Sequence, residues 1–192
     1  QDRSGALWLA RHRSGLCRFD PDTGKCTVYA SNPDDSLNPQ DMMGQVYEDR
    51  EGTLWVGSEG GLLQFDRQAE TFTVYEHDPE DPQSLSHNAV TSIYEDRSGV
   101  LWIGTNGGFN KFQQEAESFT YYQHNPSDPH SLSSNRVTSI SEDQSGGLWI
   151  GTDEGLNRFN PDTEQFTRYQ HNPSDPQSLS SNDVRSIYED PS

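Results

Sequence analysis

The sequence predicts an all-β fold, a β-propeller made of four-stranded antiparallel blades, and three observations carry this prediction. Tryptophan recurs at a spacing of 47 residues, at Trp8, Trp55, Trp102 and Trp149. Each copy of the repeat divides into four short segments of β-forming residues separated by turn residues. A period in the forties with four strands per copy is typical of a propeller blade, whereas leucine-rich repeats are shorter and helical repeats need apolar residues at i, i+3, i+4 and i+7.

The third repeat justifies the four strands in order. Val90–Asp96 alternates in polarity and is rich in β-forming residues, so it predicts the first strand. After a Gly-containing turn, Val100–Thr105 predicts the second strand, and after an Asn-Gly-Gly turn Phe109–Gln113 predicts the third. Ser118–Gln123 predicts the fourth. The loop His124–Asn135 follows, since its prolines exclude it from a central strand.

The whole chain, 1–192, is therefore predicted to be a single propeller or a propeller segment. The repeats and a closing strand are placed at approximately 1–42, 43–89, 90–136, 137–182 and 183–190.

Aromatic residues at fixed places in each repeat are expected to fill the gaps between neighbouring blades. Burying one tryptophan removes ~200 Å² from water and contributes on the order of 5 kcal/mol at ~25 cal/mol/Å². The predicted blade core consists of Trp8, Trp55, Trp102, Trp149, Phe65, Phe112, Phe159, Tyr75, Tyr122 and Tyr169.

The segment Asp183–Asp190 (DVRSIYED) has the sequence of a first strand, and the sequence opens at the turn that follows such a strand. We therefore expect this segment to complete the first blade and so protect an unpaired edge. It could do so in the same chain, as a four-bladed ring, or in a partner chain, as an eight-bladed homodimer formed by strand exchange. An open arc cut from a larger ring is the third alternative. The sequence begins at Gln1 with no initiator Met or signal peptide, so we expect a piece of something longer.

Composition narrows the range of partners. The formal charge is −18 with only 13 Lys and Arg, which argues against nucleic acid and anionic membranes. No apolar run is long enough to cross a bilayer, so a membrane could be reached only through flanking segments. The charge and low hydrophobicity resemble those of disordered chains, but regularly spaced aromatics exclude that class.

Cys17 and Cys26 both lie in the first repeat, where they could sit across one hairpin and form a disulfide in an oxidising compartment. The alternative is that both are small buried apolar residues.

No residue pattern points to catalysis, a metal or a cofactor, and none is predicted. His77, His124 and His171 occupy one place in three repeats, where each is expected to end an outer strand. Glu-Asp pairs such as Glu95-Asp96 precede a glycine turn in every repeat, and we assign them to turn stabilisation.

A ligand or protein partner is expected on one face of the propeller. The loop from each outer strand to the next inner strand lies on the same face as the turn between second and third strands. Residues that vary there between repeats include Met42-Met43 and Ala89. The predicted ligand-binding residues are Glu59, Asn106, Asp153, Glu154, Arg136 and Asp183.

One long sequence pattern recurs in three of the repeats. The pattern LWIGT-x-x-GLNRF, followed by FT-x-Y-x-HNPSDPxSLSxN and V-x-SIYED, is nearly intact at Leu148–Asp190 and recurs at Leu101–Asp143 and Leu54–Asp96. In this pattern the chain resembles the two-component regulator propeller repeat family. The first repeat departs from it, with Leu9-Ala10-Arg11-His12 in place of the W-I-G-T continuation.

This resemblance implies the extracytoplasmic sensor of a membrane receptor, such as a hybrid histidine kinase, on the periplasmic or extracellular face of a bacterial membrane. Some members respond to oligosaccharides. A non-catalytic sensor that binds a ligand or docks a protein is therefore the predicted function. The alternatives are a propeller lyase or hydrolase, which needs clustered His, Tyr and carboxylate groups or a metal, and a structural array of blades.

Overall fold

A computed structural model describes residues 1–11, 15–29 and 43–190 of the chain, and its strands form four antiparallel sheets. The first sheet has three strands, β1 (Leu7–Arg11), β2 (Gly15–Asp20) and β3 (Lys25–Tyr29). The second contains β4 (Met43–Glu48), β5 (Leu54–Ser58), β6 (Leu62–Asp66) and β7 (Thr71–Tyr75). The third contains β8 (Val90–Glu95), β9 (Leu101–Thr105), β10 (Phe109–Gln113) and β11 (Ser118–Tyr122). The fourth contains β12 (Val137–Glu142), β13 (Leu148–Thr152), β14 (Gly155–Asn160) and β15 (Gln165–Tyr169).

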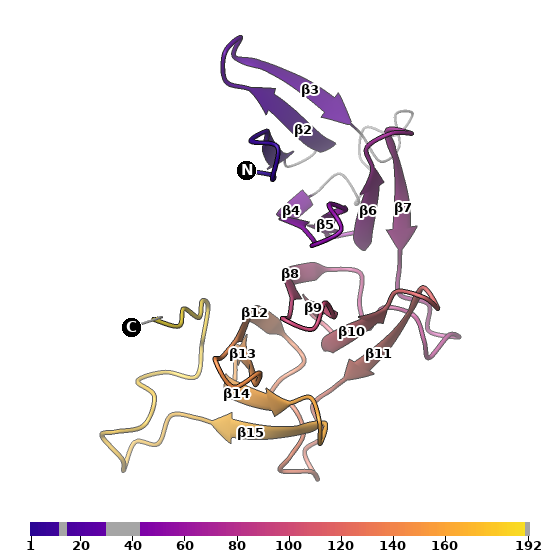
Figure 1. Cartoon of the computed structure of the whole chain (residues 1–192). Helices are drawn as coiled ribbons and strands as arrows, with labels where there is room; N and C mark the ends of the chain where they lie inside the picture. The colour runs from indigo at the N-terminus through magenta and orange to yellow at the C-terminus, as the bar shows by residue number, and fades with distance from the viewer. Residues whose placement is uncertain (12–14, 30–42, 191–192) are drawn as a thin grey trace.

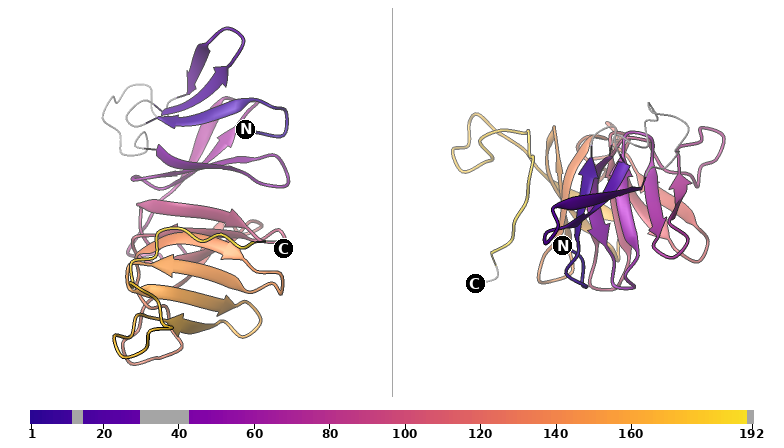
Figure 2. Two further views of the ribbon diagram at one scale, coloured as in Figure 1. Left: turned by 90° about the vertical axis from the view of Figure 1, so that its left-hand side faces the viewer. Right: turned by 90° about the horizontal axis from the view of Figure 1, so that it is seen from above.

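The four sheets are the blades of a propeller arranged along an open arc (Figure 1). Each blade pairs its strands in sequence order, and the first strands of the second, third and fourth blades contact one another, β4 with β8 and β8 with β12. In the first blade, β1 corresponds to the second strands β5 and β9, and it contacts β4. A side view shows the blades stacked in sequence order (Figure 2, left). The all-β propeller prediction is confirmed, and in the third blade each strand begins or ends within one residue of its predicted bounds.

The turn between first and second strands explains why the repeat keeps an Asp and a Gly there. One carboxylate oxygen of Asp96, Oδ1, accepts hydrogen bonds from the backbone N–H groups of Ser98 (2.9 Å) and Val100 (3.0 Å). The N–H of Gly99 donates to the carbonyl of Asp96, and Gly99 has φ of 89°. Residues with a Cβ atom are strained at that φ, so glycine is favoured in the turn where the chain reverses direction between the two strands.

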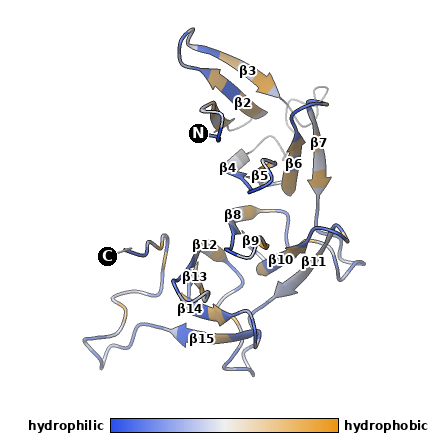
Figure 3. Ribbon diagram, in the orientation of Figure 1, coloured by the Kyte–Doolittle hydropathy of each residue, from blue (hydrophilic) through white to orange (hydrophobic). Residues whose placement is uncertain are grey.

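Apolar side chains pack between neighbouring blades, and in Figure 3 the apolar colour follows the strands while the turns are mostly hydrophilic. Between the third and fourth blades, Trp102 stacks on Phe109 at 4.8 Å between ring centroids and meets Phe159 edge-on at 5.5 Å. Equivalent clusters centre on Trp55 between the second and third blades and on Phe65 between the first and second.

The burial of the predicted core residues depends on the blade they occupy. Internal positions are covered: Trp55, Trp102, Phe65, Phe112 and Phe159 are buried, while Trp8, Tyr75 and Tyr122 pack against the clusters as partly buried groups. Trp149 is half-buried. The assignment of Tyr169 to the core is wrong for the single chain, because this side chain is 42% exposed. Its counterpart Tyr122 packs on the next blade, and no next blade follows Tyr169 in the described residues.

Of the alternatives for Asp183–Asp190, completion of the first blade within the same chain does not occur in this structure. The sheet β1-β2-β3 keeps three strands, and residues 183–190 form no strand with it. The first blade and this segment lie at opposite ends of the arc in Figure 1, so a single chain in this conformation cannot bring them together. Completion by a partner chain stays a prediction.

Cys17 and Cys26 lie on β2 and β3 with Cα atoms 5.8 Å apart, and the structure joins them in a disulfide. Cys17 is fully buried, whereas Cys26 is exposed, so the alternative of two buried apolar residues does not hold for Cys26.

We expect reduction of this disulfide to lower the stability of the first blade by on the order of 2–3 kcal/mol, the loop-closure entropy of a loop this short. Intact-mass measurement after alkylation without reductant checks the bond, and the thermal unfolding midpoint with and without reductant checks its effect. A Cys26→Ser variant is the control, since its midpoint should not respond to reductant. Two alkylated thiols in the unreduced protein would contradict the expectation.

Candidate functional site

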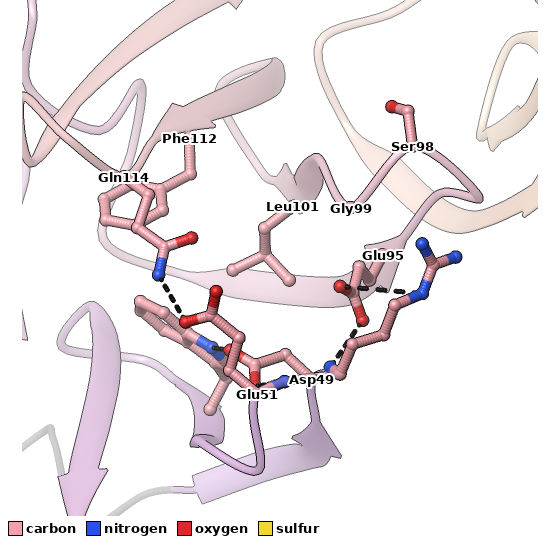
Figure 4. Close-up of a pocket in the computed structure, with 10 residues that line it drawn as sticks. Asp49, Glu51, Glu95, Ser98, Gly99, Leu101, Phe112 and Gln114 are labelled. Carbon is pink, nitrogen blue, oxygen red and sulfur yellow. Dashed lines mark hydrogen bonds and ion pairs between the residues drawn. The ribbon is translucent and has the colours of Figure 1, made fainter.

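One face of the arc carries the turns between first and second strands, and a pocket of about 270 Å³ opens there between the second and third blades (Figure 4). Its acidic side chains are already engaged. Asp49 accepts a hydrogen bond from the indole Nε1–H of Trp55 at 2.7 Å, and Glu51 accepts one from Gln114 at 3.0 Å. Glu95 accepts the backbone N–H of Arg50 at 2.9 Å. The bond of Asp49 lies within the second blade, and those of Glu51 and Glu95 join the second and third blades, so we assign the pocket a structural role.

The bond made by Glu95 recurs between every pair of blades. The glutamate of each Glu-Asp pair accepts a backbone N–H from the turn of the preceding blade, so it links blades while its neighbouring Asp stabilises its own turn. The donor and acceptor pairs are Arg3 and Glu48, Arg50 and Glu95, Arg97 and Glu142, and Gln144 and Glu189. The sequence assigned both acids to the turn, and the linking role of the glutamate was missed.

The opposite face, where the sequence predicted a binding site, contains a depression of about 470 Å³. It lies where the third and fourth blades meet the C-terminal segment. Its lining residues are Thr91, Arg136, Val137, Thr138, Asp153, Asp183 and Arg185. The structure therefore brings together three of the predicted binding residues, Arg136, Asp153 and Asp183, from a loop, a β13–β14 turn and the C-terminal segment.

The charges in this depression are not all paired. Asp183 and Arg185 form an ion pair at 2.9 Å, but their side chains are 45% and 83% exposed, so solvent screens it. The guanidinium of Arg136 forms no ion pair with any described residue. The Oδ1 atom of Asp153 is buried and has no hydrogen-bond partner among the described residues. A buried carboxylate oxygen without a hydrogen-bond donor is energetically unfavourable.

The other predicted binding residues lie on the same face but outside this depression. Glu59, Asn106 and Glu154 are exposed in the turns between second and third strands. The backbone N–H of Asn106 donates to the carbonyl of Ala89 at 3.1 Å, and Gln170 donates to the carbonyl of Glu154 at 2.8 Å. Met43 begins β4, and Met42 lies outside the described residues.

Two buried asparagines that the sequence analysis did not single out fix the loops of this face. Asn157 is fully buried; its Oδ1 accepts the backbone N–H of Ser133 at 2.9 Å. Asn110 does the same for Ser86 at 2.9 Å. Asparagine at one position of two successive repeats was the available signal, since Leu63 stands there in the second repeat.

The repeated histidines also hold these loops. In His124 the Nδ1–H donates to the carbonyl of Leu132 at 2.7 Å, and its backbone N–H donates to Asn135. His77 and His171 make the equivalent contacts. Across the described ranges, no three His, Cys, Asp or Glu side chains gather as metal ligands would, and no helix is long and apolar enough to span a membrane.

Comparison with solved structures finds propellers. One similar structure is the extracellular domain of a protein assigned as a hybrid two-component system from B. thetaiotaomicron, with 23% identity and a TM-score of 0.59. The match includes 99% of this chain and 36% of that domain. A streptogramin B lyase matches at 15% identity and TM-score 0.64, with 93% and 55% covered. A virginiamycin B lyase from Staphylococcus aureus matches at 15% identity and TM-score 0.62, with 90% and 54% covered. These likenesses show the fold alone, and the chain spans between about a third and just over half of those structures.

No curated protein shows significant sequence similarity to the chain. A family model described as the two component regulator propeller matches residues 36–60, 84–107 and 131–154, and each match contains the first two strands of a blade, β4 and β5, β8 and β9, and β12 and β13. These matches recur with the same 47-residue spacing as the blades. The chain therefore contains three segments that match the two-component regulator propeller repeat.

Proposed function

We propose that this chain is part of the extracytoplasmic sensor of a two-component-type receptor in a bacterial membrane, and that it binds a small hydroxylated ligand, such as an oligosaccharide, without chemical turnover. Two findings support the proposal. Three segments match the two-component regulator propeller repeat, and a structure with the same fold is the extracellular domain of a protein assigned to a hybrid two-component system.

The observation that carries the proposal is the depression lined by Arg136, Asp153 and Asp183. A ligand hydroxyl can donate to the carboxylate of Asp153, and a second hydroxyl can accept from Arg136. Because the lining residues come from two blades and the C-terminal segment, a bound ligand would contact all three. Such bridging is how a ligand stabilises one arrangement of the blades over another.

A thermal-shift screen with purified malto-, cello-, xylo- and arabino-oligosaccharides tests this function. We expect one class to raise the unfolding midpoint, because a ligand that binds only the folded state stabilises it. Asp153→Asn should then weaken binding by about tenfold or more, since a hydrogen bond to a charged group contributes ~1.5–3 kcal/mol.

Glu59→Gln is the matched control. Glu59 stands at the same place in the second blade as Asp153 in the fourth, but it is exposed and lies outside the depression. Equal weakening by both variants would contradict the assignment of the site. A midpoint unchanged by every oligosaccharide would contradict sugar sensing, and release of a shortened sugar would favour an enzyme.

A lyase or hydrolase is the alternative, since two of the similar structures are lyases. Their 15% identity shows only the fold. The residues that line the depression include no histidine and no tyrosine. We therefore favour binding without turnover.

A further inference from the structure

The first and last blades of the arc expose apolar side chains that internal blades bury. Among the described residues, the exposed large hydrophobic side chains are Leu9, Val28, Tyr169 and Tyr188. Leu9 is 44% exposed on β1, whereas its counterparts Val56 and Ile103 are fully buried. Ile103 belongs to the same cluster as Trp55 of the preceding blade, so Leu9 has the side chain for a blade-to-blade contact, and no other described blade covers it. Both end faces of the described arc therefore expose side chains that internal blades use for packing.

The C-terminal segment Asp183–Asp190 already lies on the fourth blade as the first strand of a further blade would. The N–H of Val184 donates to the carbonyl of Thr152 at 3.0 Å, and its carbonyl accepts the hydroxyl of Thr138. The same hydroxyl-to-carbonyl bond joins Thr91 to Val137, the first residue of β12.

Two further contacts of the segment match those of β12, a valine packed against a glycine and a glutamate that accepts a backbone N–H. A Cβ at Gly151 would lie 3.0 Å from Cγ1 of Val184, and a Cβ at Gly104 would lie 2.5 Å from Cγ1 of Val137, so each valine presses on a bare glycine of the preceding blade. Glu189 accepts the N–H of Gln144, as Glu142 accepts that of Arg97. Near both of its ends, at Val184 and at Glu189, the segment thus contacts the fourth blade as a first strand contacts the blade before it.

The first blade, in turn, has a vacant place that suits this segment. A pocket of about 70 Å³ between the first and second blades is lined by Gln1, Asp2, Trp8, Val46, Glu48 and Leu54. The equivalent place between the second and third blades is filled by Tyr47, which packs against the Trp55 cluster. Tyr188 has the same position in the repeat as Tyr47 and is 84% exposed.

We infer that two copies of this chain exchange these segments and close as an eight-bladed ring. Residues 183–190 of each copy pair with β1 of the other, in the register that β8 and β9 show. Because Tyr94 pairs with Trp102 and Glu95 with Leu101, Tyr188 pairs with Trp8 and Glu189 with Leu7 of the second copy.

The dimensions of the arc agree with this inference. The chain superimposes on 54–55% of the length of two propeller lyases with TM-scores of 0.62–0.64, so its blades are arranged like about half of a propeller. Two such arcs give eight blades, within the range that propellers adopt. The two new seams are identical and related by a two-fold axis, so the ring closes and leaves no free edge.

Light scattering of the 192-residue chain at several concentrations tests the inference. We expect a mass of 43.2 kDa, twice the 21.6 kDa of one chain. Leu9→Lys should reduce the mass to 21.6 kDa, because it places a charge in the seam, and should leave each arc folded since Leu9 is exposed in the single chain. Tyr188→Ala should also weaken the dimer, because it removes the side chain that is inferred to fill the place beside Trp8.

Val28→Arg is the matched control. Arg168 occupies the same position in the fourth blade, where its guanidinium donates to the carbonyls of Ser131 and Asp128, so this variant should stay dimeric. A wild-type mass of 21.6 kDa at every concentration overturns the inference, as does a mass that grows without limit. Dimers that tolerate Leu9→Lys overturn the proposed seam. None of these readouts involves a sugar, so this inference and the proposed function can fail separately.

Discussion

Replacing Trp102 with alanine is expected to destabilise the protein by about 3–5 kcal/mol, the cost of removing a large aromatic side chain from a packed core. Trp102 is 2% exposed, stacks on Phe109 and meets Phe159 across the seam between the third and fourth blades. Its indole N–H also donates to Asp96 at 2.8 Å. Domains are stable by only about 5–15 kcal/mol, so the loss is a large fraction of the total.

Chemical denaturation followed by circular dichroism measures this loss, with Trp102→Phe as the companion variant. Phenylalanine keeps an aromatic ring in the seam but leaves Asp96 without the indole donor, so we expect a loss of about 1–2 kcal/mol. The ratio of the two losses separates packing from hydrogen bonding. Equal losses for the two variants would contradict the view that ring packing holds these blades together.

The repeat predicted the fold because each strand is defined by local chemistry, such as the turn at Asp96 and the alternation in β8. It could not predict burial at the first and last blades, since the sequence positions of Tyr169 and Tyr122 are equivalent. Only the presence of a neighbouring blade makes Tyr122 a core residue and leaves Tyr169 exposed. A periodic sequence specifies what each residue can contact, and the number of blades decides whether it does.

The candidate site was predictable in part for a similar reason. Arg136, Asp153 and Asp183 were found because they vary between repeats on a face that the topology defines. Their convergence depends on the position of the C-terminal segment against β12, which no local pattern encodes. The unpaired oxygen of Asp153 is likewise a property of the packed structure.

Acid is expected to destabilise the protein through the aspartates of the blade turns. Burial alone would raise the pKa of Asp96, but hydrogen bonds from Ser98, Trp102 and Val100 outweigh it and hold this pKa below its usual range. The pKa of Asp143 is lowered in the same way, by bonds from Ser145, Arg158 and Gly147 that outweigh burial. The folded state therefore favours the ionised carboxylates more than the unfolded state does.

The sign of the pH dependence follows from these directions. An aspartate in the unfolded chain has a pKa of about 3.9, so the stabilisation is fully present above about pH 5 and is lost progressively as pH falls below that value. As pH falls through this range, each such carboxylate lowers the free energy of unfolding by at most ~1.4 kcal/mol per pH unit. Urea midpoints measured from neutral pH to pH 2 should therefore drop sharply at the acid end.

Asp96→Asn tests the cause of this acid sensitivity. The amide oxygen can still accept the backbone N–H groups of the turn, but the amide NH₂ then faces the indole N–H of Trp102, and a buried donor loses its acceptor. We expect a loss of about 1–3 kcal/mol at neutral pH, and a shallower fall in acid because one carboxylate no longer titrates.

Asp66→Asn is the matched control, because Asp66 caps an exposed turn through two backbone N–H groups and Asn160 makes the same contacts in the fourth blade. This variant should stay close to wild type at neutral pH, since an asparagine at this position leaves the turn intact. An Asp96→Asn protein as stable as Asp66→Asn would mean that the bond between Asp96 and Trp102 does not hold the seam, and packing alone would then have to account for the effect of Trp102→Ala.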